Sequence, residues 1–474
     1  MKIVSGINPH IFRGYDIRGV ADKDLSEDVY YTLGRGYATY LSERRIKECV
    51  VGRDNRLTGE LYSNAFIKGL NDGGVDTYNI GLSLSQIVYF SSYHFKTKGT
   101  AMLTASHNPK EYNGLKLGTG YSETMVTDEI IAFRDLVDSK KFSKGSGKNT
   151  EIDIFPDYKE DVLKHFSLKK KWKVVIDACN TTSGMFYPEI LRGAGCEVIE
   201  QNTELDGSFP LGVPDPTEVE VLERLAEGVK KANADIGFAY DTDGDRMAVV
   251  NEKGEVLYMD TAVALFAQDI LDYMPGAPIV YNTFCSRQVT EAIEKAGGKP
   301  VMEMTGHSFI KARIKQEKAP FGGELSGHIF FFDNFYGHDD GAYASIRLLQ
   351  YLERTEQSLS EAVSKLSQYY SSPEIKLGLA DDIKFQLIAN EITDDFKKTW
   401  PKAEFINIDG VRMDLPDRMA IVRASQNGPY VGIKFEAKNK QDYDLVKTQV
   451  RDILKKYPQI KFDDPIAVNT HALE

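Results

Sequence analysis

Apolar and polar positions follow one pattern that recurs three times along the chain. A short apolar strand leads into a polar loop, a helical stretch, a glycine-containing turn and a second strand. Glycine suits the left-handed residue that closes a helix before the next strand. Such units predict parallel strands with right-handed crossovers, and three of them predict three related α/β domains, chance similarity being the alternative. The units occupy residues 48–81, 172–202 and 277–308.

The pattern changes near residue 370. Strand-like segments at 403–415, 419–426 and 430–437 precede a helical stretch at 442–457, which is typical of a smaller α+β domain. The Lys/Ser/Gly-rich stretch 139–150 reads as a linker, and residues 246–260 read as a β-hairpin. We therefore predict four domains, with the ranges 1–152, 153–258, 259–369 and 370–474.

Composition narrows the class of protein. The chain has 474 residues, of which 42% are hydrophobic and 27% charged, and a formal net charge of −12. An acidic chain does not favour nucleic acid as a partner. The sequence shows neither a signal-peptide layout nor an apolar run of the ~20 residues that a membrane helix needs. Four scattered cysteines predict reduced, buried thiols, and hence a cytoplasmic multidomain protein.

The segment 101–118 carries a candidate nucleophile. The apolar run AMLTA delivers Ser106, His107 and Asn108, and Pro109 ends it. Open α/β sheets bind ligands at the carboxyl ends of their strands. A serine hydroxyl there needs a neighbouring base or metal before it becomes a good nucleophile. Taken alone, the same four residues also fit a polar turn.

The segment 234–250 carries a candidate metal site. An apolar strand ends in Asp241, Asp243 and Asp245, and Gly244 permits a tight turn. Three converging carboxylates repel one another unless a hard cation such as Mg²⁺ lies between them. An EF-hand is excluded because Arg246 occupies the position that needs glycine and a hairpin follows in place of a helix. A solvated acidic turn is the remaining alternative.

Two further loops suit recognition of a sugar phosphate. Alternating donors and acceptors in GGELSGH (322–328) fit sugar hydroxyls, and a surface hairpin is the alternative. An arginine followed by a small polar turn at 423–428 fits a phosphate, although this signal is weak alone. His307 and Lys311 fit anion binding and the start of a helix equally well.

Taken together and in this order, TASHNPKEYNGLK, DTDGDR and GGELSGH resemble the α-D-phosphohexomutase family, in its phosphomannomutase/phosphoglucomutase branch. The resemblance runs from residue 12 to residue 437. It implies three mixed α/β domains and a C-terminal α+β domain around a central cleft. It also implies an isomerase that interconverts hexose 1-phosphate and hexose 6-phosphate, of mannose or glucose, through a phosphoserine and a hexose 1,6-bisphosphate.

The resemblance assigns a role to individual residues. Ser106 is implied to be the phosphoserine, and it would share Mg²⁺ with the three aspartates. Arg18 and Arg246 are implied as its cationic partners, and Lys116 and His328 as the groups that handle protons, with their division of labour open. The implied substrate contacts are Tyr15, His307, Glu324, Ser326, Arg423, Ser425, Gln426, Asn427 and Lys434.

This chain departs from the family pattern at two places. Gln426 and Asn427 stand where relatives commonly carry Asn-Thr, and Phe284 stands where a lysine often precedes Cys285. One substrate-binding cation is therefore missing, with Arg287 as a candidate substitute. The alternatives are a mutase restricted to glucose phosphate or glucosamine phosphate, a metal-dependent sugar phosphatase, and a sugar-phosphate binding protein without turnover.

Overall fold

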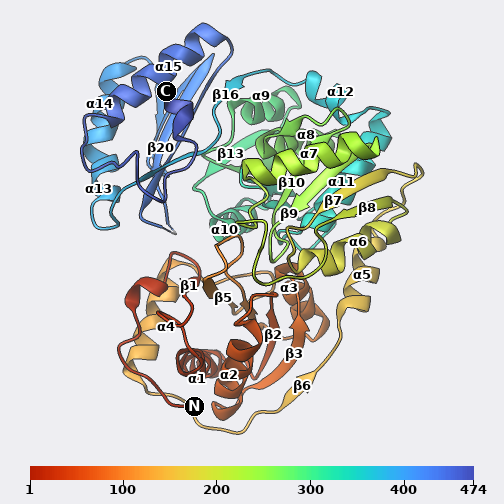
Figure 1. Ribbon diagram of the computed structural model, residues 1–474, viewed down its shortest axis with the longest axis vertical. Helices are drawn as coiled ribbons and strands as arrows, with labels where there is room; N and C mark the ends of the chain where they lie inside the picture. The colour runs from red at the N-terminus through yellow and green to blue at the C-terminus, as the bar shows by residue number, and fades with distance from the viewer. Residues whose placement is uncertain (427) are drawn as a thin grey trace. The chain divides into compact units, whose positions relative to one another are not determined.

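The computed structural model describes residues 1–426 and 428–474, which form two compact units (Figure 1). Unit 1 consists of residues 1–259 and 326–362, and unit 2 of residues 260–325 and 363–474. Asn427 lies outside the described residues. Among the described helices, none is long and apolar enough to cross a membrane. The four domain ranges given above stay a prediction.

The N-terminal part of unit 1 is built on a mixed six-stranded sheet. Its elements are η1 (Pro9–Ile11), β1 (Ile17–Val20), α1 (Glu27–Glu43), β2 (Glu48–Arg53), α2 (Gly59–Asp72), β3 (Asp76–Leu82), α3 (Ser85–His94), β4 (Gly99–Leu103), β5 (Tyr112–Gly118), α4 (Thr127–Ser139) and β6 (Asn149–Glu151). The strand order is β1-β5-β4-β2-β3-β6, with β5 antiparallel to both of its neighbours. Helices α1, α2 and α4 pack together and share an apolar core with the sheet (Figure 1).

The remainder of unit 1 is built on a second mixed sheet, with the order β11-β10-β9-β7-β8 for strands whose bounds follow. The elements of this part of unit 1 are α5 (Phe155–Leu163), β7 (Lys173–Asp177), α6 (Ser183–Gly193), β8 (Glu197–Gln201), α7 (Val219–Ala232), β9 (Ile236–Tyr240), β10 (Met247–Asn251), β11 (Val256–Leu257), β15 (Ile329–Phe331), which is not a strand of this sheet, and α11 (Gly341–Thr355). Every residue of β9 is buried, because α7 packs beside Gly237 while Tyr240 meets Tyr187 of α6 and Ser345 of α11 on its opposite face.

Unit 2 contains a parallel sheet and an antiparallel one. α8 (Met259–Tyr273) and α12 (Leu359–Ser364) lead into it from unit 1. The other elements are β12 (Pro278–Asn282), α9 (Arg287–Lys295), β13 (Lys299–Glu303), α10 (His307–Glu317), β14 (Phe321–Gly323), β16 (Tyr370–Ser371), β17 (Ile375–Gly378), α13 (Lys384–Leu387), the π-helix η2 (Ile388–Ile392), α14 (Thr393–Thr399), β18 (Glu404–Ile406), β19 (Val411–Leu415), β20 (Arg418–Ala424), β21 (Tyr430–Ala437), α15 (Lys440–Leu454) and η3 (Thr470–Leu473). β12 runs parallel to β13 and β14, whereas β16 to β21 pair antiparallel and α14 and α15 pack on them.

The three repeated units of the sequence are confirmed as strand–helix–strand units with parallel strands. They are β2–α2–β3, β7–α6–β8 and β12–α9–β13. A glycine with positive φ follows each helix: Gly74 at +92°, Gly195 at +94° and Gly297 at +76°. The turn signal in the sequence therefore reports a left-handed backbone that a side chain would strain. The hairpin at 246–260 is also confirmed, as β10 and β11.

Candidate active site

The predicted nucleophile, Ser106, lies in the irregular loop between β4 and β5. Its side chain is buried, and its backbone φ is +49°, in the left-handed region that L-residues seldom adopt. Such a conformation costs about 1–3 kcal/mol and persists only where its surroundings enforce it. The hydroxyl donates to Oδ2 of Asp241 at 2.7 Å, and its Oγ lies 3.2 Å from Nδ1 of His107. The loop thus turns the Ser106 hydroxyl toward the acidic loop that follows β9.

The three predicted metal ligands converge directly after the buried strand β9. The ligand atoms of Asp241, Asp243 and Asp245 all lie within 4.8 Å of one another, and the three side chains are buried. Gly244 makes the turn with a φ of +70°. Burial, together with the neighbouring carboxylates of Asp243 and Asp245, raises the pKa of Asp241 well above its ordinary value. Closely spaced buried carboxylates favour either a cation among them or a proton on one of them.

Lys116 of β5 supplies positive charge to this cluster. Its ammonium donates to Oδ2 of Asp243 at 2.6 Å and to Oδ2 of Asp245 at 2.5 Å. Burial opposes the charge of Lys116, but the two carboxylates outweigh it and hold its pKa well above the ordinary value. Burial likewise opposes ionisation of Asp245, yet Lys116 lowers its pKa. Lys116 is therefore an ammonium in this arrangement.

The residues present fit a divalent metal ion. Oδ1 of Asp243 and Oδ1 of Asp245 are buried and accept no hydrogen bond within the described chain. Two such oxygens beside the carboxylate of Asp241 and the hydroxyl of Ser106 form an oxygen-only donor set, which hard cations prefer. The acidic triad is able to hold a metal ion.

His328 belongs to the same cluster. Arg246 donates from Nε to Nε2 of His328 at 3.0 Å. Because a guanidinium has no acceptor, Nε2 carries no proton, and the ring is the neutral tautomer that donates from Nδ1 to Asp339 at 2.7 Å. The two predicted proton-handling groups therefore both lie at the acidic triad. Lys116 carries a proton to donate, and His328 is a neutral ring.

Arg18 and Tyr15 also lie at this site, although not against the Ser106 hydroxyl. Arg18 donates to Asp16 at 2.7 Å, to the side chain of Asn108 at 2.7 Å and to the Ala105 carbonyl at 3.3 Å. Tyr15 is buried and close enough to Arg18 and Arg246 to affect the pKa of each. Unit 1 thus brings Tyr15, Arg18, Ser106, Lys116, the three aspartates, Arg246 and His328 to the same loops. Ser326, two residues before His328, is half-buried in the same unit.

Within unit 2, Arg423 is held by two contacts. Its Nε donates to Oδ2 of Asp409 at 2.7 Å, and its guanidinium lies 5.6 Å from the ring centre of Phe284. Ser425 accepts from the backbone N–H of Gly428 at 3.1 Å, which closes the predicted phosphate turn. Gln426 is half-buried, and Asn427, also a predicted substrate contact, lies outside the described part of the chain. The ring of Phe284 therefore packs against the arginine of this loop.

Lys434 differs from Arg423. It is fully buried, and its ammonium donates to Asp260 at 2.6 Å and to the Phe284 carbonyl at 3.2 Å. Arg287, the candidate substitute for the missing lysine, pairs with Asp414 at 3.3 Å. Both cations thus already neutralise a carboxylate of unit 2.

The structure also places the remaining candidates of unit 2. His307 is the first residue of α10 and Lys311 lies in its next turn, which is compatible with both readings, so a substrate contact at His307 stays a prediction. Glu324 is buried, and its Oε1 accepts from the backbone N–H of Gly306 at 2.8 Å. Glu324 therefore fixes the turn that precedes α10.

Sequence reasoning missed several residues that hold the site together. Asp339 orients His328, and Asp215 lies 3.8 Å from Arg246 and 3.9 Å from His107. Ser85, the first residue of α3, donates to Asp243. The sequence signal for Asp339 is an acidic residue beside a histidine in HDD (338–340), and that for Asp215 is an acidic residue between prolines in PDP (214–216).

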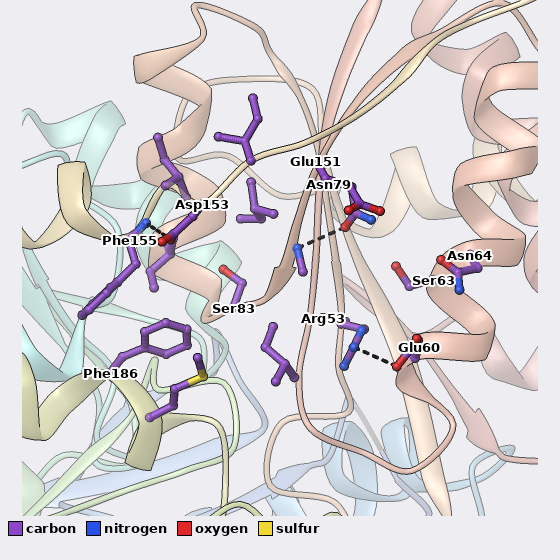
Figure 2. Close-up of a pocket in the computed structure, with 17 residues that line it drawn as sticks. Arg53, Glu60, Ser63, Asn64, Asn79, Ser83, Glu151, Asp153, Phe155 and Phe186 are labelled. Carbon is purple, nitrogen blue, oxygen red and sulfur yellow. Dashed lines mark hydrogen bonds and ion pairs between the residues drawn. The ribbon is translucent and has the colours of Figure 1, made fainter.

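A cavity of about 670 Å³ in unit 1 is separate from these residues. Figure 2 shows it between α2, β3 and the chain that leads into α5, with Phe155 and Phe186 on one side and Arg53 paired with Glu60 on the other. None of the described lining residues is a predicted site residue. We locate the chemistry at the acidic triad because that is where nucleophile, carboxylates and cations converge.

Comparisons with known proteins identify the family of the chain. Family models described as phosphoglucomutase/phosphomannomutase alpha/beta/alpha domains I, II and III match residues 9–142, 156–254 and 258–370. A phosphomannomutase/phosphoglucomutase of Pseudomonas aeruginosa is 37% identical over 446 residues, covering 94% of this chain and 95% of the relative. A phosphoglucomutase of Neisseria meningitidis is 34% identical over 465 residues, covering 96% and 99%.

A solved structure gives the same result. A phosphoglucomutase/phosphomannomutase family protein from Burkholderia thailandensis superposes with a TM-score of 0.87 at 34% identity, covering 95% of this chain and 98% of the other. Fold and site together define a hexose-phosphate mutase, an isomerase. The chain belongs to the phosphoglucomutase/phosphomannomutase family. The predicted family, mixed α/β fold and enzyme class are confirmed.

Proposed function

We propose that this mutase moves a phosphoryl group between O1 and O6 of mannose and glucose phosphates through phosphorylated Ser106. The contact that carries this proposal is the 2.7 Å hydrogen bond from the Ser106 hydroxyl to Asp241 of the acidic triad. A substrate hydroxyl attacks the phosphoryl group on Ser106, the bond to Oγ breaks, and a hexose 1,6-bisphosphate forms. The bisphosphate then returns its other phosphoryl group to Ser106.

The acidic triad and two arginines are the groups that would govern the charge of this transfer. Asp241, Asp243 and Asp245 are the residues that would hold Mg²⁺, together with an oxygen on Ser106. When bound, the ion would neutralise charge on the transferring phosphoryl group. Arg18 bonds to Ala105 O and Asn108 in the Ser106 loop, and the Arg246 guanidinium lies 4.0 Å from Oδ2 of Asp241, so each would place positive charge near the transferring group. Two crystal structures of one structural neighbour, the N-acetylphosphoglucosamine mutase of Aspergillus fumigatus, contain magnesium with GlcNAc-6P and glucose 1,6-bisphosphate, respectively; at 13% identity this neighbour shares the fold with the present chain.

The geometry also supports a division of the proton transfers. His328 is neutral, and its Nε2 lone pair accepts from Arg246 in this arrangement; it is the proposed base for the attacking hydroxyl once that hydrogen bond is released. Lys116 is an ammonium and is the proposed acid that returns a proton when Ser106 is released. Asp339 fixes the ring of His328 in the tautomer that this role requires.

One assay separates the candidate functions. The protein is incubated with mannose 1-phosphate, Mg²⁺ and a trace of glucose 1,6-bisphosphate, and the products are followed by ³¹P NMR. Mannose 6-phosphate supports the proposal. Release of inorganic phosphate would indicate a phosphatase, and an unchanged substrate would indicate binding without turnover. The four buried free cysteines fit the reducing cytoplasm, where we propose that the reaction takes place.

Replacement of Arg423 tests the proposed phosphate anchor. We expect Arg423→Ala to lower kcat/KM about 10- to 100-fold, since a charge-assisted hydrogen bond contributes about 1.5–3 kcal/mol. Both KM and kcat should change, because binding energy at the unreactive phosphate orients the reacting end. Arg418→Ala is the matched control, since Arg418 lies on the same strand and pairs with Asp417 and Asp442. Equal kinetics for the two variants would place the anchor elsewhere.

Sugar specificity follows from the two-way binding of the intermediate. The bisphosphate must bind with C1 and C6 exchanged, so protein contacts have to suit hydroxyls that nearly superpose when the ring turns over, as O3 and O4 do. Buried Glu324 and half-buried Ser326 suit that pair, whereas apolar Leu325 offers nothing to the substituent at C2. We expect similar kcat/KM for mannose 1-phosphate and glucose 1-phosphate, and a much lower value for glucosamine 1-phosphate. A preference above about 100-fold between the first two, or ~3 kcal/mol, would contradict this.

A further inference from the structure

The loop that carries Ser106 has to be held from outside, because it has no regular structure of its own. Residues 104–111 connect β4 to β5 and lie outside every helix and strand. Ser106 within it adopts a φ of +49°. Backbone carbonyls in such a buried loop need donors from elsewhere in the protein. Arg18 supplies one such donor, to Ala105 O at 3.3 Å, and the backbone N–H of Ala21 supplies another, to Glu111 O at 2.8 Å. Arg56 supplies four, more than any other side chain among the described residues.

Arg56 follows β2 and reaches across to four carbonyls of this region. Its Nη2 donates to Ser106 O and Asn108 O, each at 2.7 Å. Its Nη1 donates to Pro109 O at 2.7 Å and to Tyr112 O at 2.9 Å. The fifth N–H, on Nε, donates to Asp54 Oδ2 at 3.2 Å. A guanidinium has five N–H donors, and here all of them are used.

Asp54 fixes Arg56 to the end of β2. Its Oδ1 accepts from the backbone N–H of Arg56 at 3.0 Å, and its own N–H donates to Leu103 O at 3.0 Å, next to the start of the Ser106 loop. Both side chains are buried, and the ring of Phe209 lies 5.0 Å from the Arg56 guanidinium. The pair therefore links the carboxyl end of β2 to the end of the neighbouring strand β4 and to the loop that follows it.

Because every N–H of Arg56 is already bonded, none is left for a phosphoryl oxygen, so Arg56 is not a substrate contact. Arg18 differs, since it touches the same loop through Ala105 O and Asn108 but also pairs with Asp16. We propose that Asp54 and Arg56 form a positioning pair that holds Ser106 in its left-handed backbone, with Oγ directed at Asp241. This role rests on the proposed function of Ser106 as phosphoryl carrier.

The test compares Arg56→Ala and Arg56→Lys with wild type. In Arg56→Ala we expect kcat to fall about 100-fold with KM within about twofold, since a misplacement of 1 Å at a reacting group costs that much. Arg56→Lys keeps the charge but cannot span four carbonyls, so a loss of about tenfold is expected. Guanidinium ion added to Arg56→Ala should restore at least a tenth of the lost rate, and intact-mass analysis should show slower phosphorylation of Ser106 by glucose 1,6-bisphosphate.

Two control variants separate positioning from a general loss of stability. Arg53→Ala removes an arginine from the same segment that pairs with Glu60 at the cavity of Figure 2 and makes a long 3.5 Å hydrogen bond to the Asp54 carbonyl, without a bond to the Ser106 loop among the described contacts. Arg35→Ala removes a buried arginine that donates to Ser143 O. Both control variants should keep the wild-type kcat at 25 °C. Circular dichroism at that temperature checks that each variant is folded. A kcat loss in Arg56→Ala no greater than in Arg35→Ala, or no rescue by guanidinium, would overturn the proposal. If Ser106→Ala were active, the proposed function would fail instead.

Discussion

Ser106→Ala is expected to lower kcat by about 10⁴-fold or more, equivalent to ~5.5 kcal/mol of activation free energy. The hydroxyl is the only group of this loop that both faces the acidic triad and can carry a phosphoryl group in the proposed reaction. The measurement is turnover of glucose 1-phosphate with Mg²⁺ and glucose 1,6-bisphosphate, together with intact-mass detection of the phosphoenzyme. Activity in the variant above about 1% of wild type would contradict the assignment of Ser106.

The backbone at Ser106 suggests a sharper pair of variants. Alanine keeps a Cβ in the left-handed region, whereas glycine adopts a φ of +49° without strain. Ser106→Gly should therefore be more stable than Ser106→Ala in thermal unfolding, yet equally inactive. Ser91→Ala, which removes a buried serine hydroxyl bonded only within helix α3, is the control for losing a hydrogen bond. An activity that follows stability across the three variants would show that the hydroxyl is structural.

The parts of the fold that depend on local pattern could be predicted from the sequence. Strand, helix and left-handed glycine recur within about 30 residues in each repeat, so every signal lies inside one segment. The π-helix η2 (Ile388–Ile392) and the short helices beside it could not be predicted. Their register depends on how Ile388, Ile392 and Phe396 pack into the core of the C-terminal sheet, which no local periodicity encodes.

The candidate site divides in the same way. Ser106 and the aspartates are recognisable because each follows an apolar strand, where parallel sheets present their functional residues. Asp339 contacts His328, 11 positions away, and Arg56 contacts Ser106, 50 positions away. Nothing in the segments around Asp339 and Arg56 indicates these partners. Lys434 is the opposite case, a residue whose predicted role the sequence suggests but whose actual partner the sequence does not reveal. Its type and place after Arg423 fit a phosphate anchor, but Asp260, distant in sequence, already accepts from its ammonium.

Lys116→Met is the prediction that links charge, stability and catalysis at the triad. Removing the ammonium leaves Asp243 and Asp245 buried without their cation, and breaking a buried ion pair in this way costs about 3–5 kcal/mol. In EDTA we expect the thermal midpoint of Lys116→Met to fall by about 10 °C. Mg²⁺ should restore most of that loss, because an ion that binds only the native state stabilises it. The activity should stay about 10²- to 10⁴-fold below wild type with Mg²⁺ present, since the proposed acid is absent.

The same variant should bind Mg²⁺ more tightly than wild type, because the ion no longer competes with the ammonium for Asp243 and Asp245. Isothermal titration calorimetry measures this directly. The double variant Lys116→Met/Asp243→Asn removes one carboxylate with the cation, so in EDTA it should recover part of the lost stability while its Mg²⁺ affinity falls. Mg²⁺ affinity that is unchanged in Lys116→Met, with no difference between the single and double variants in EDTA, would show that Lys116 does not compensate the triad. A gain in affinity accompanied by loss of turnover would instead place Lys116 in both roles, as counter-charge of the empty acidic cluster and as proton donor once the ion is bound.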